Sequence, residues 1–285
     1  MVSIELELPD DFLLEENRNG YLVTKKMKEV WAIELDLLNK FLQVCKKYNL
    51  EYFAESGTLL GAIRHKGFIP WDDDIDIVMF REDYIKLCEV AEKEFHNPYF
   101  FQTEFTDPGS VRGHIQIRNS LTTGIRNVEF NEECRFNQGI FIDIFPMDKI
   151  PNNSNKVDFF RRLKYMQTKM IEFSIENYRK NCSTEKNPYF QEFEELCQRY
   201  NCNSKAVQIG AIEYSCDRSD MIRNVEDYKD FVEVDFEFLK IRVPIGYRRV
   251  LTEQYGNWNE CIVGNSGHGD VFFDTDVPYI KYIGG

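Results

Sequence analysis

The sequence predicts a mixed α/β fold, in which a mixed β-sheet is flanked by helices and a helical insertion follows in the second half. Three observations predict it. Apolar residues near the start recur at the 3.6-residue spacing of an amphipathic helix, short β-branched and aromatic runs follow, and helical patterns return later in the chain. With 285 residues and 43% hydrophobic content, the chain can bury a sizeable core.

Helices and strands are expected to alternate over the first 150 residues. Trp31, Leu38 and Phe41 mark the apolar face of the opening helix. Gly67 ends the second helix, since glycine readily takes the backbone conformation that follows a helix and Pro70 cannot continue it. The expected elements are a helix over 24–48, a strand over 51–55, a helix over 58–67, a strand over 75–80, a helix over 81–95, and strands over 99–102, 114–118, 122–126 and 140–145.

The character of the chain changes after Pro151. We expect an insertion with three helices, over 156–179, 189–200 and 204–217. A strand over 236–243, a short helix over 246–256 and a turn-rich tail over 257–285 follow. This gives an N-terminal segment over 1–23, an α/β core over 24–150, the helical insertion over 151–234, and a C-terminal part over 235–285 that completes the core.

Composition narrows the function classes. A net charge of −13 and a pI near 4.9 disfavour a nucleic-acid groove or a broad anionic membrane surface, because both need clustered Lys and Arg. The start has no basic region followed by an apolar run, and no segment approaches the length of a transmembrane helix, although work at a membrane surface stays open. We therefore expect a cytoplasmic chain whose eight cysteines are reduced thiols and not a zinc site.

Acidic side chains cluster in the segment IPWDDDIDI at 69–77. Side chains alternate between two faces of an extended chain, so Asp72, Asp74 and Asp76 share one face while Ile75 and Ile77 point into the core. Like charges this close repel unless they are protonated or bind a cation, and Mg²⁺ or Mn²⁺ prefers oxygen ligands. The pattern predicts a metal site, in which Asp72 either binds metal or orients the loop.

A second strand carries a single carboxylate, Asp143, within the run GIFIDIFP at 139–146. Alone, such an aspartate is more often a hydrogen-bonded structural residue than a functional one. Phosphoryl and nucleotidyl transfer, however, commonly uses two metal ions about 3.5–4 Å apart that carboxylates from neighbouring strands share. We therefore expect Asp74, Asp76 and Asp143 to hold two Mg²⁺ or Mn²⁺ ions.

These motifs resemble one family closely. GTLLGAIRH at 57–65 together with IPWDDDID at 69–76 is similar to the signature of the LicD family of phosphotransferases, which are related to fukutin-type proteins and share the nucleotidyltransferase fold. The similarity continues through FIDIFP at 141–146, PIGY at 244–247 and the tail, and covers roughly residues 25 to 283. It implies a nucleotidyltransferase-like sheet and a metal-dependent phosphotransferase.

The resemblance implies transfer of a substituted phosphate from a donor such as CDP-choline to a hydroxyl of a glycan, a teichoic acid or lipopolysaccharide precursor, or a lipid-linked oligosaccharide. Asp74, Asp76 and Asp143 would be the catalytic metal ligands, and Asp143 could also be the base. The helix that begins beside Gly57 and Thr58 would bind donor phosphate through its N–H groups and a hydroxyl. Further phosphate contacts are expected from Arg64 first, and from His65.

Substrate contacts are expected from Trp71, Tyr247, His268, Asp274 and Tyr279. If the cargo is choline, the aromatic rings of Trp71, Trp258 or Tyr279 would face its quaternary ammonium. Two alternatives stay open. A nucleotidyltransferase would use the same aspartates with a nucleoside triphosphate, and a non-catalytic binding protein could keep the same fold.

Overall fold

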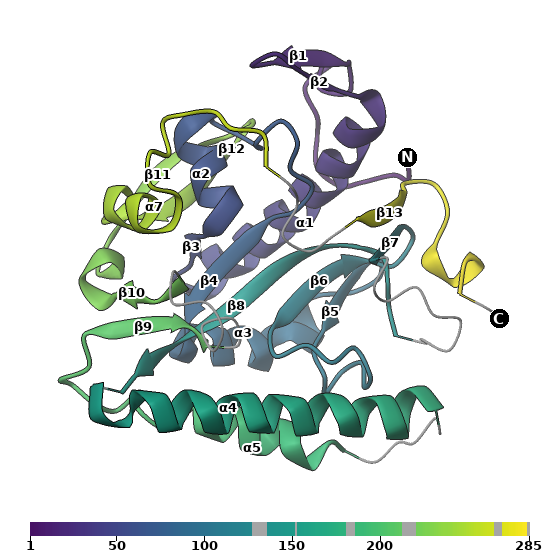
Figure 1. Cartoon of the computed structure of the whole chain (residues 1–285). Helices are drawn as coiled ribbons and strands as arrows, with labels where there is room; N and C mark the ends of the chain where they lie inside the picture. Colours follow the sequence, from purple (N-terminus) through teal and green to yellow (C-terminus); the bar gives the residue numbers. More distant parts are fainter. Residues whose placement is uncertain (127–135, 152, 181–185, 213–220, 265–269, 284–285) are drawn as a thin grey trace.

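A central β-sheet organises the computed structural model (Figure 1), which describes residues 1–285 apart from 127–135, 152, 181–185, 213–220, 265–269 and 284–285. In the described part of the chain this sheet has seven strands, and its longest strand, β8, lies in the middle. Its strands are β3 (Phe53–Ala54), β4 (Asp76–Phe80), β5 (Tyr99–Gln102), β6 (Ile115–Asn119), β8 (Ile140–Ile150), β9 (Gln208–Ala211) and β10 (Arg223–Asn224).

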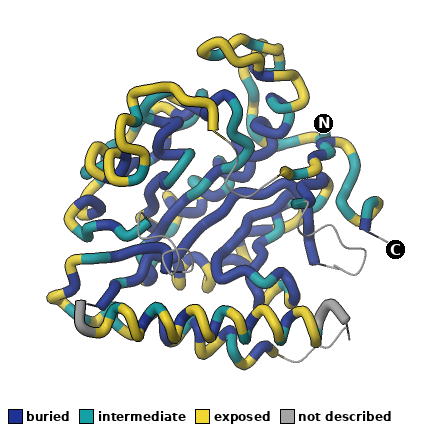
Figure 2. Tube along the Cα trace, viewed as in Figure 1, coloured by how far each residue is buried: buried dark blue, intermediate teal, exposed yellow. Residues whose placement is uncertain are grey.

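Strand β8 pairs with three neighbours, which makes the sheet mixed. Strand β4 runs parallel to it, whereas β6 and β9 are antiparallel to its first and last residues. Figure 2 shows the strands of this sheet buried over most of their length, as a strand with neighbours on both edges and helices on its faces should be. The mixed sheet with flanking helices is the fold class that the sequence predicts.

Helices α1 (Lys25–Tyr48) and α3 (Arg81–Glu94) pack against β8 from one side. The side chain of Thr24 accepts a hydrogen bond from Met27 N–H and caps α1, and Asn49 takes a left-handed backbone at its end. Around the β3 edge lie α2 (Ser56–Arg64), α7 (Tyr247–Tyr255) and the hairpin of β11 (Phe231–Phe236) and β12 (Leu239–Pro244).

Helices α4 (Asn153–Ser174) and α5 (Pro188–Gln198) lie side by side along the bottom of the view in Figure 1, with a π-helical turn at Ile175–Lys180. Phe159, Leu163 and Phe193 belong to a second apolar core between them. The buried guanidinium of Arg81 in α3 pairs with Asp148 in β8 and Glu194 in α5, and so links this layer to the main sheet.

Smaller elements complete the molecule. The hairpin of β1 (Glu16–Arg18) and β2 (Tyr21–Val23) lies at the top of Figure 1, and β7 (Thr123–Arg126) pairs with β13 (Val271–Asp274). Short 3₁₀ helices cover Val225–Tyr228 and Tyr279–Lys281. Within the described residues, none of the helices combines the length and the apolar character that crossing a membrane requires.

Two expected elements are wrong. The helix expected over 204–217 includes Gln208–Ala211, which form β9 because pairing with β8 overrides a weak local helical preference. The single strand expected over 236–243 is a hairpin, since Glu237 takes a left-handed backbone (φ 53°) and reverses the chain between β11 and β12. The turn-rich tail also contains a strand, β13.

Candidate active site

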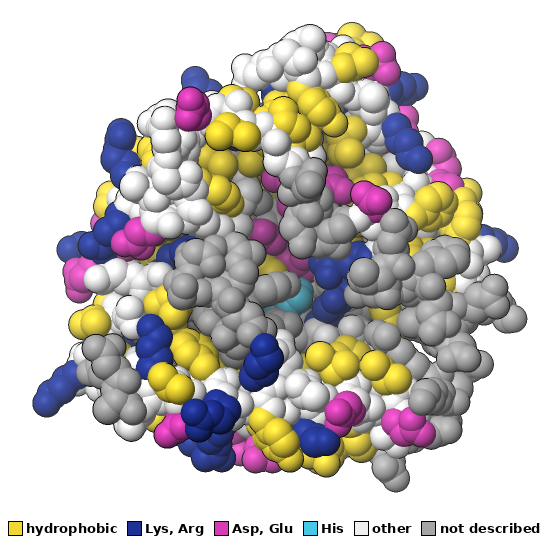
Figure 3. Space-filling model, viewed as in Figure 1, with side chains coloured by type: hydrophobic (Ala, Val, Ile, Leu, Met, Phe, Trp, Pro, Cys, Tyr) yellow, Lys and Arg dark blue, Asp and Glu magenta, His cyan; other side chains and the backbone are white. Residues whose placement is uncertain are grey.

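A cavity of about 620 Å³ lies beside the edge where β4 begins. Its described lining includes all four aspartates that the sequence singled out for metal binding, namely Asp72, Asp74, Asp76 and Asp143. Figure 3 shows acidic side chains gathered in a hollow near the centre of one face, with basic side chains beside them. The structure therefore brings together the two acidic segments that lie about seventy residues apart in the sequence.

Strand pairing places these carboxylates next to one another. Asp76 and Asp143 are register partners on the parallel strands β4 and β8, and Asp143 N–H donates to the carbonyl of Ile75 at 2.9 Å. Ile75 and Ile77 are fully buried, as the alternation predicts. Asp73 is not among the described residues that line the cavity. The strand itself begins at Asp76, so the earlier aspartates lie on the loop that leads into it.

Asp143 is held by polar partners from β6, from the residue just before it, and from β7. Its Oδ1 accepts from Gln116 Nε2 at 2.5 Å and lies 3.0 Å from His114 Nε2, and its Oδ2 lies 3.5 Å from the guanidinium of Arg126. Burial by itself raises the pKa of this carboxyl, but His114, Arg126 and Gln116 outweigh it and hold the pKa well below its ordinary value. Asp143 is thus ionised and fixed in position.

The start of α2 forms the adjoining wall, through Glu55, Ser56 and Gly57. A Cβ on Gly57 would lie 2.5 Å from Asp72 Oδ2, so the helix start can approach this carboxylate closely because residue 57 is glycine. The buried Thr58 hydroxyl accepts a hydrogen bond from Asp76 N–H at 2.8 Å. Thr58 therefore contacts the start of β4 and is not among the described residues that line the cavity.

Two arginines belong to the described lining of the cavity, Arg64 and Arg126. One guanidinium nitrogen of Arg64 donates to the carbonyls of Trp258 (3.2 Å) and Glu260 (3.0 Å). These bonds connect α2 to the segment 258–260, which also contributes to the cavity lining. His65 lies outside the described lining and contacts Arg64 Nε at 2.8 Å. Burial, with the nearby charges of Arg64 and Arg18, lowers the pKa of His65 to about 4. His65 is therefore neutral near pH 7.

The predicted substrate residues are divided. Trp71 lines the cavity, whereas Tyr247, Asp274 and Tyr279 do not belong to its described lining. Asp274 instead accepts hydrogen bonds from the backbone N–H groups of residues 276 and 277 and from the Tyr282 hydroxyl, and so closes a turn after β13. His268 lies outside the described residues.

Sequence reasoning missed several lining residues, including Arg126, Glu55 and Tyr255. Arg126 ends a predicted strand with no local sign that its side chain faces Asp143. Glu55 precedes the glycine turn directly, which was a usable signal. Its carboxylate is buried, pairs with Arg223 and accepts from the Tyr228 hydroxyl, so the stretch 223–228, far downstream, fixes it.

The donor chemistry and charge of the cavity fit a divalent cation. Burial, followed by the negative charges of Asp73, Asp74, Asp72 and Asp143, raises the pKa of the fully buried Glu34 well above its ordinary value, which shows how negative this region is. In the described part of the chain, no group of three or more His, Cys, Asp or Glu side chains is preassembled to hold a metal ion. Metal dependence therefore stays a prediction.

Comparison with known proteins decides the family. Residues 49–184 match the family model described as the LicD/FKTN/FKRP nucleotidyltransferase domain, and this range contains the glycine turn and all four cavity aspartates. The chain carries a LicD-family domain. This confirms the resemblance that GTLLGAIRH and IPWDDDID carry. The N-terminal hairpin, Arg223 and the wall formed by α7 and the segment after it lie outside the matched range.

LicD-family relatives extend the match beyond that domain. The lipopolysaccharide cholinephosphotransferase LicD of Haemophilus influenzae is 27% identical over 251 residues, which cover 81% of this chain and 91% of that protein. An uncharacterized protein of Rickettsia prowazekii is 45% identical over 137 residues, 48% of this chain and 45% of its own length. Human ribitol 5-phosphate transferase FKRP is 25% identical over 149 residues, 43% of this chain and 29% of its length. The chain is accordingly a transferase.

Proposed function

We propose that this LicD-family chain transfers a substituted phosphate, phosphocholine from CDP-choline, to a hydroxyl of a cell-surface glycan precursor such as a lipopolysaccharide or teichoic acid precursor. The observation that carries the proposal is the meeting of Asp74, Asp76 and Asp143 in one cavity beside a helix start. The Haemophilus relative, named a lipopolysaccharide cholinephosphotransferase, supports the cargo and the type of acceptor. The human relative, named a ribitol 5-phosphate transferase, supports the reaction class.

In the proposed reaction the acceptor oxygen attacks the phosphorus that carries choline. The bond from that phosphorus to the bridging oxygen breaks, CMP leaves, and the acceptor hydroxyl gives up its proton to solvent. A divalent cation held by Asp74, Asp76 and Asp143 would neutralise phosphate charge and lower the pKa of the acceptor hydroxyl. Because its own pKa is well below the ordinary range, Asp143 suits binding better than uptake of that proton.

The other lining residues have complementary tasks. The N–H groups at the start of α2 favour an anion, and Arg64 and Arg126 add positive charge on the cavity wall. The rings of Trp71 and Trp258 also line the cavity and offer the aromatic faces that attract a quaternary ammonium group. Together these groups match a donor that joins a diphosphate to choline.

Calorimetric titration tests the donor. The purified chain should bind CDP-choline with Mg²⁺ present and much more weakly without it. Tighter binding of CTP than of CDP-choline, with release of pyrophosphate in product analysis, would support nucleotidyl transfer instead. If neither ligand binds in either condition, the proposed donor class is wrong.

Turnover tests the site. Asp74→Asn should abolish transfer of phosphocholine to a glycan acceptor, because it removes one of the proposed metal ligands. Asp158→Asn is the matched control, since Asp158 is exposed on α4, pairs with Arg161 and does not belong to the described cavity lining. A chelator should remove activity and Mn²⁺ should restore it. Near-normal turnover of Asp74→Asn with metal present would contradict the assignment.

A further inference from the structure

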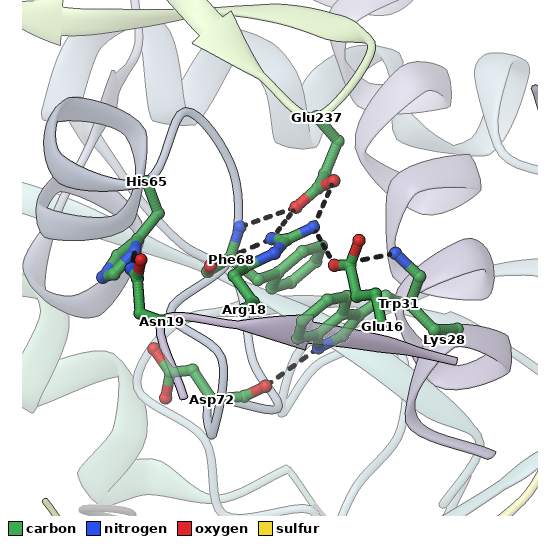
Figure 4. A network of polar contacts seen from close by, with 9 residues as sticks. All are labelled: Glu16, Arg18, Asn19, Lys28, Trp31, His65, Phe68, Asp72 and Glu237. Carbon is green, nitrogen blue, oxygen red and sulfur yellow. Dashed lines mark hydrogen bonds and ion pairs between the residues drawn. The ribbon is translucent and has the colours of Figure 1, made fainter. Parts of the chain in front are cut away.

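Charged residues far apart in the sequence meet over the segment that carries the aspartates. We define the aspartate loop as residues 65–75, between α2 and β4. Figure 4 shows Arg18, from the N-terminal hairpin of β1 and β2, and Glu237, from the turn between β11 and β12, beside this loop. Neither residue lies in the matched LicD-family range or lines the described cavity.

Arg18 and Glu237 hold the backbone of the loop from both sides. The Arg18 guanidinium donates to the Phe68 carbonyl at 3.2 Å and to both carboxylate oxygens of Glu237, at 2.6 and 3.1 Å. Glu237 in turn accepts from Phe68 N–H at 3.0 Å, and its own N–H donates to the Lys66 carbonyl at 2.7 Å. A Cβ on Gly67 would lie 2.0 Å from Glu237 Oε1, so the fit between carboxylate and loop requires glycine there.

An aromatic stack extends this hold to the first aspartate. The indole of Trp31 in α1 lies nearly parallel to the Phe68 ring, with centroids 4.6 Å apart and an interplanar angle of 5°. The Arg18 guanidinium lies 5.1 Å from the Trp31 ring centroid. Trp31 Nε1–H donates to the Asp72 carbonyl at 2.9 Å, as Figure 4 shows. Trp31 therefore joins Phe68, which it stacks on, to the peptide of Asp72.

The turn and second strand of the hairpin make two further contacts with the loop. The Asn19 amide lies 2.8 Å from His65 Nδ1, and His65 contacts Arg64, which lines the cavity. Tyr21 packs edge-on against Trp71, with ring centroids 5.8 Å apart. The hairpin thus contacts the loop at residues 65, 68 and 71.

We propose that the N-terminal hairpin is a positioning strap for the aspartate loop, with two positioning residues: Arg18 of the hairpin and its partner Glu237 from the turn between β11 and β12. The strap fixes the loop backbone so that Asp72 and Asp74 present their carboxylates to the cavity. Side chains that orient ligand-bearing residues without touching the metal can change metal affinity or activity by about 10–100-fold. The inference rests on the proposed function in one respect, that these carboxylates bind a divalent cation.

The first test measures backbone hydrogen exchange by mass spectrometry in Arg18→Ala. Exchange in residues 65–75 should become faster, while exchange in α4 should stay as in the unchanged protein. Arg161→Ala, which breaks an exposed ion pair on α4, is the matched control and should leave the loop unchanged. Glu237→Gln is the second variant, should Arg18→Ala not fold. Unchanged exchange in the loop, or faster exchange throughout the chain, would overturn the proposal.

The second test measures Mn²⁺ binding by calorimetry at a temperature where all variants are folded. Arg18→Ala should bind Mn²⁺ about tenfold or more weakly, and Arg18→Lys should recover part of the loss, since lysine keeps the charge but not the planar fork that bridges Phe68 and Glu237. If the loop exchanges faster but Mn²⁺ affinity is unchanged, the strap stabilises the loop without positioning its carboxylates for metal binding, and that part of the proposal is wrong. If the unchanged protein binds no Mn²⁺, the proposed function fails, and the exchange result still decides whether the strap fixes the loop.

Discussion

Replacing Asp143 with asparagine should reduce stability as well as activity. If only the repulsion among the clustered aspartates mattered, removing one carboxylate charge would stabilise the protein. In the structure, Asp143 is instead a buried anion held by Gln116, His114 and Arg126. Asparagine keeps the shape but loses the charge, so three charge-assisted contacts weaken and Arg126 loses its nearby counter-charge. Hydrogen bonds to charged groups contribute about 1.5–3 kcal/mol each, and breaking a buried pair costs about 3–5 kcal/mol. We expect a loss of about 2–4 kcal/mol.

Urea denaturation of Asp143→Asn at pH 7 measures this loss, with Asp76→Asn as the comparison from the neighbouring strand. Asp76 lines the same cavity but is only partly buried, so its replacement should cost less stability. The folded-state pKa of Asp143 is depressed, so its contribution is present above the unfolded pKa of the carboxyl and disappears only as pH falls through the lower folded value. An unchanged or higher free energy of unfolding for Asp143→Asn would refute this reasoning.

Three further predictions concern Gly61 in α2, His65 just after α2, and Arg126 in the cavity lining. Gly61→Ala should destabilise the protein by about 1–2 kcal/mol in urea denaturation, because a Cβ would lie 2.4 Å from the Gly67 carbonyl and overpacking outweighs a gain of about 1 kcal/mol in helix propensity. Gly264→Ala is the control and should leave the free energy of unfolding unchanged, because a Cβ there has no atom within 4 Å. His65→Gln should flatten the pH dependence of stability between about pH 4 and 6.5, where the unfolded chain binds the proton that folded His65 does not, so that stability otherwise rises with pH. Arg126→Gln should raise the KM for the donor in steady-state kinetics, and an unchanged KM would exclude a phosphate contact.

Local patterns predicted the parts of the site that depend on chain periodicity. Alternation along IPWDDDIDI puts Asp72, Asp74 and Asp76 on the cavity side, and the structure confirms this while burying Ile75 and Ile77. The fold class follows from the same kind of signal. These features need only the geometry of one segment, so one sequence is enough to find them.

Features that depend on distant partners could not be predicted in this way. The left-handed backbone of Glu237 creates a hairpin turn without the glycine or asparagine that usually signals one. Strand β9 is specified by its pairing with β8, which no local helical or strand preference records. Arg126 and Arg18 reach Asp143 and Phe68 from other elements, and nothing in their own neighbourhoods marks them. Sequence reasoning thus identified the aspartates, but not the two arginines that contact Asp143 and the aspartate loop.

Because the cavity is negatively charged, we expect the metal ion to bind before the donor. Its described lining carries six carboxylates, from two glutamates and four aspartates, against the two guanidinium groups of Arg64 and Arg126. A diphosphate donor adds more negative charge, and in a partly enclosed site this repulsion is screened less than in water. Each divalent cation bound before the donor arrives would offset two of these negative charges. Donor affinity should therefore rise steeply with Mg²⁺ concentration, whereas Mg²⁺ should bind measurably without donor. Equal donor affinity with and without Mg²⁺ would mean that the arginines and the start of α2 suffice to hold the phosphates.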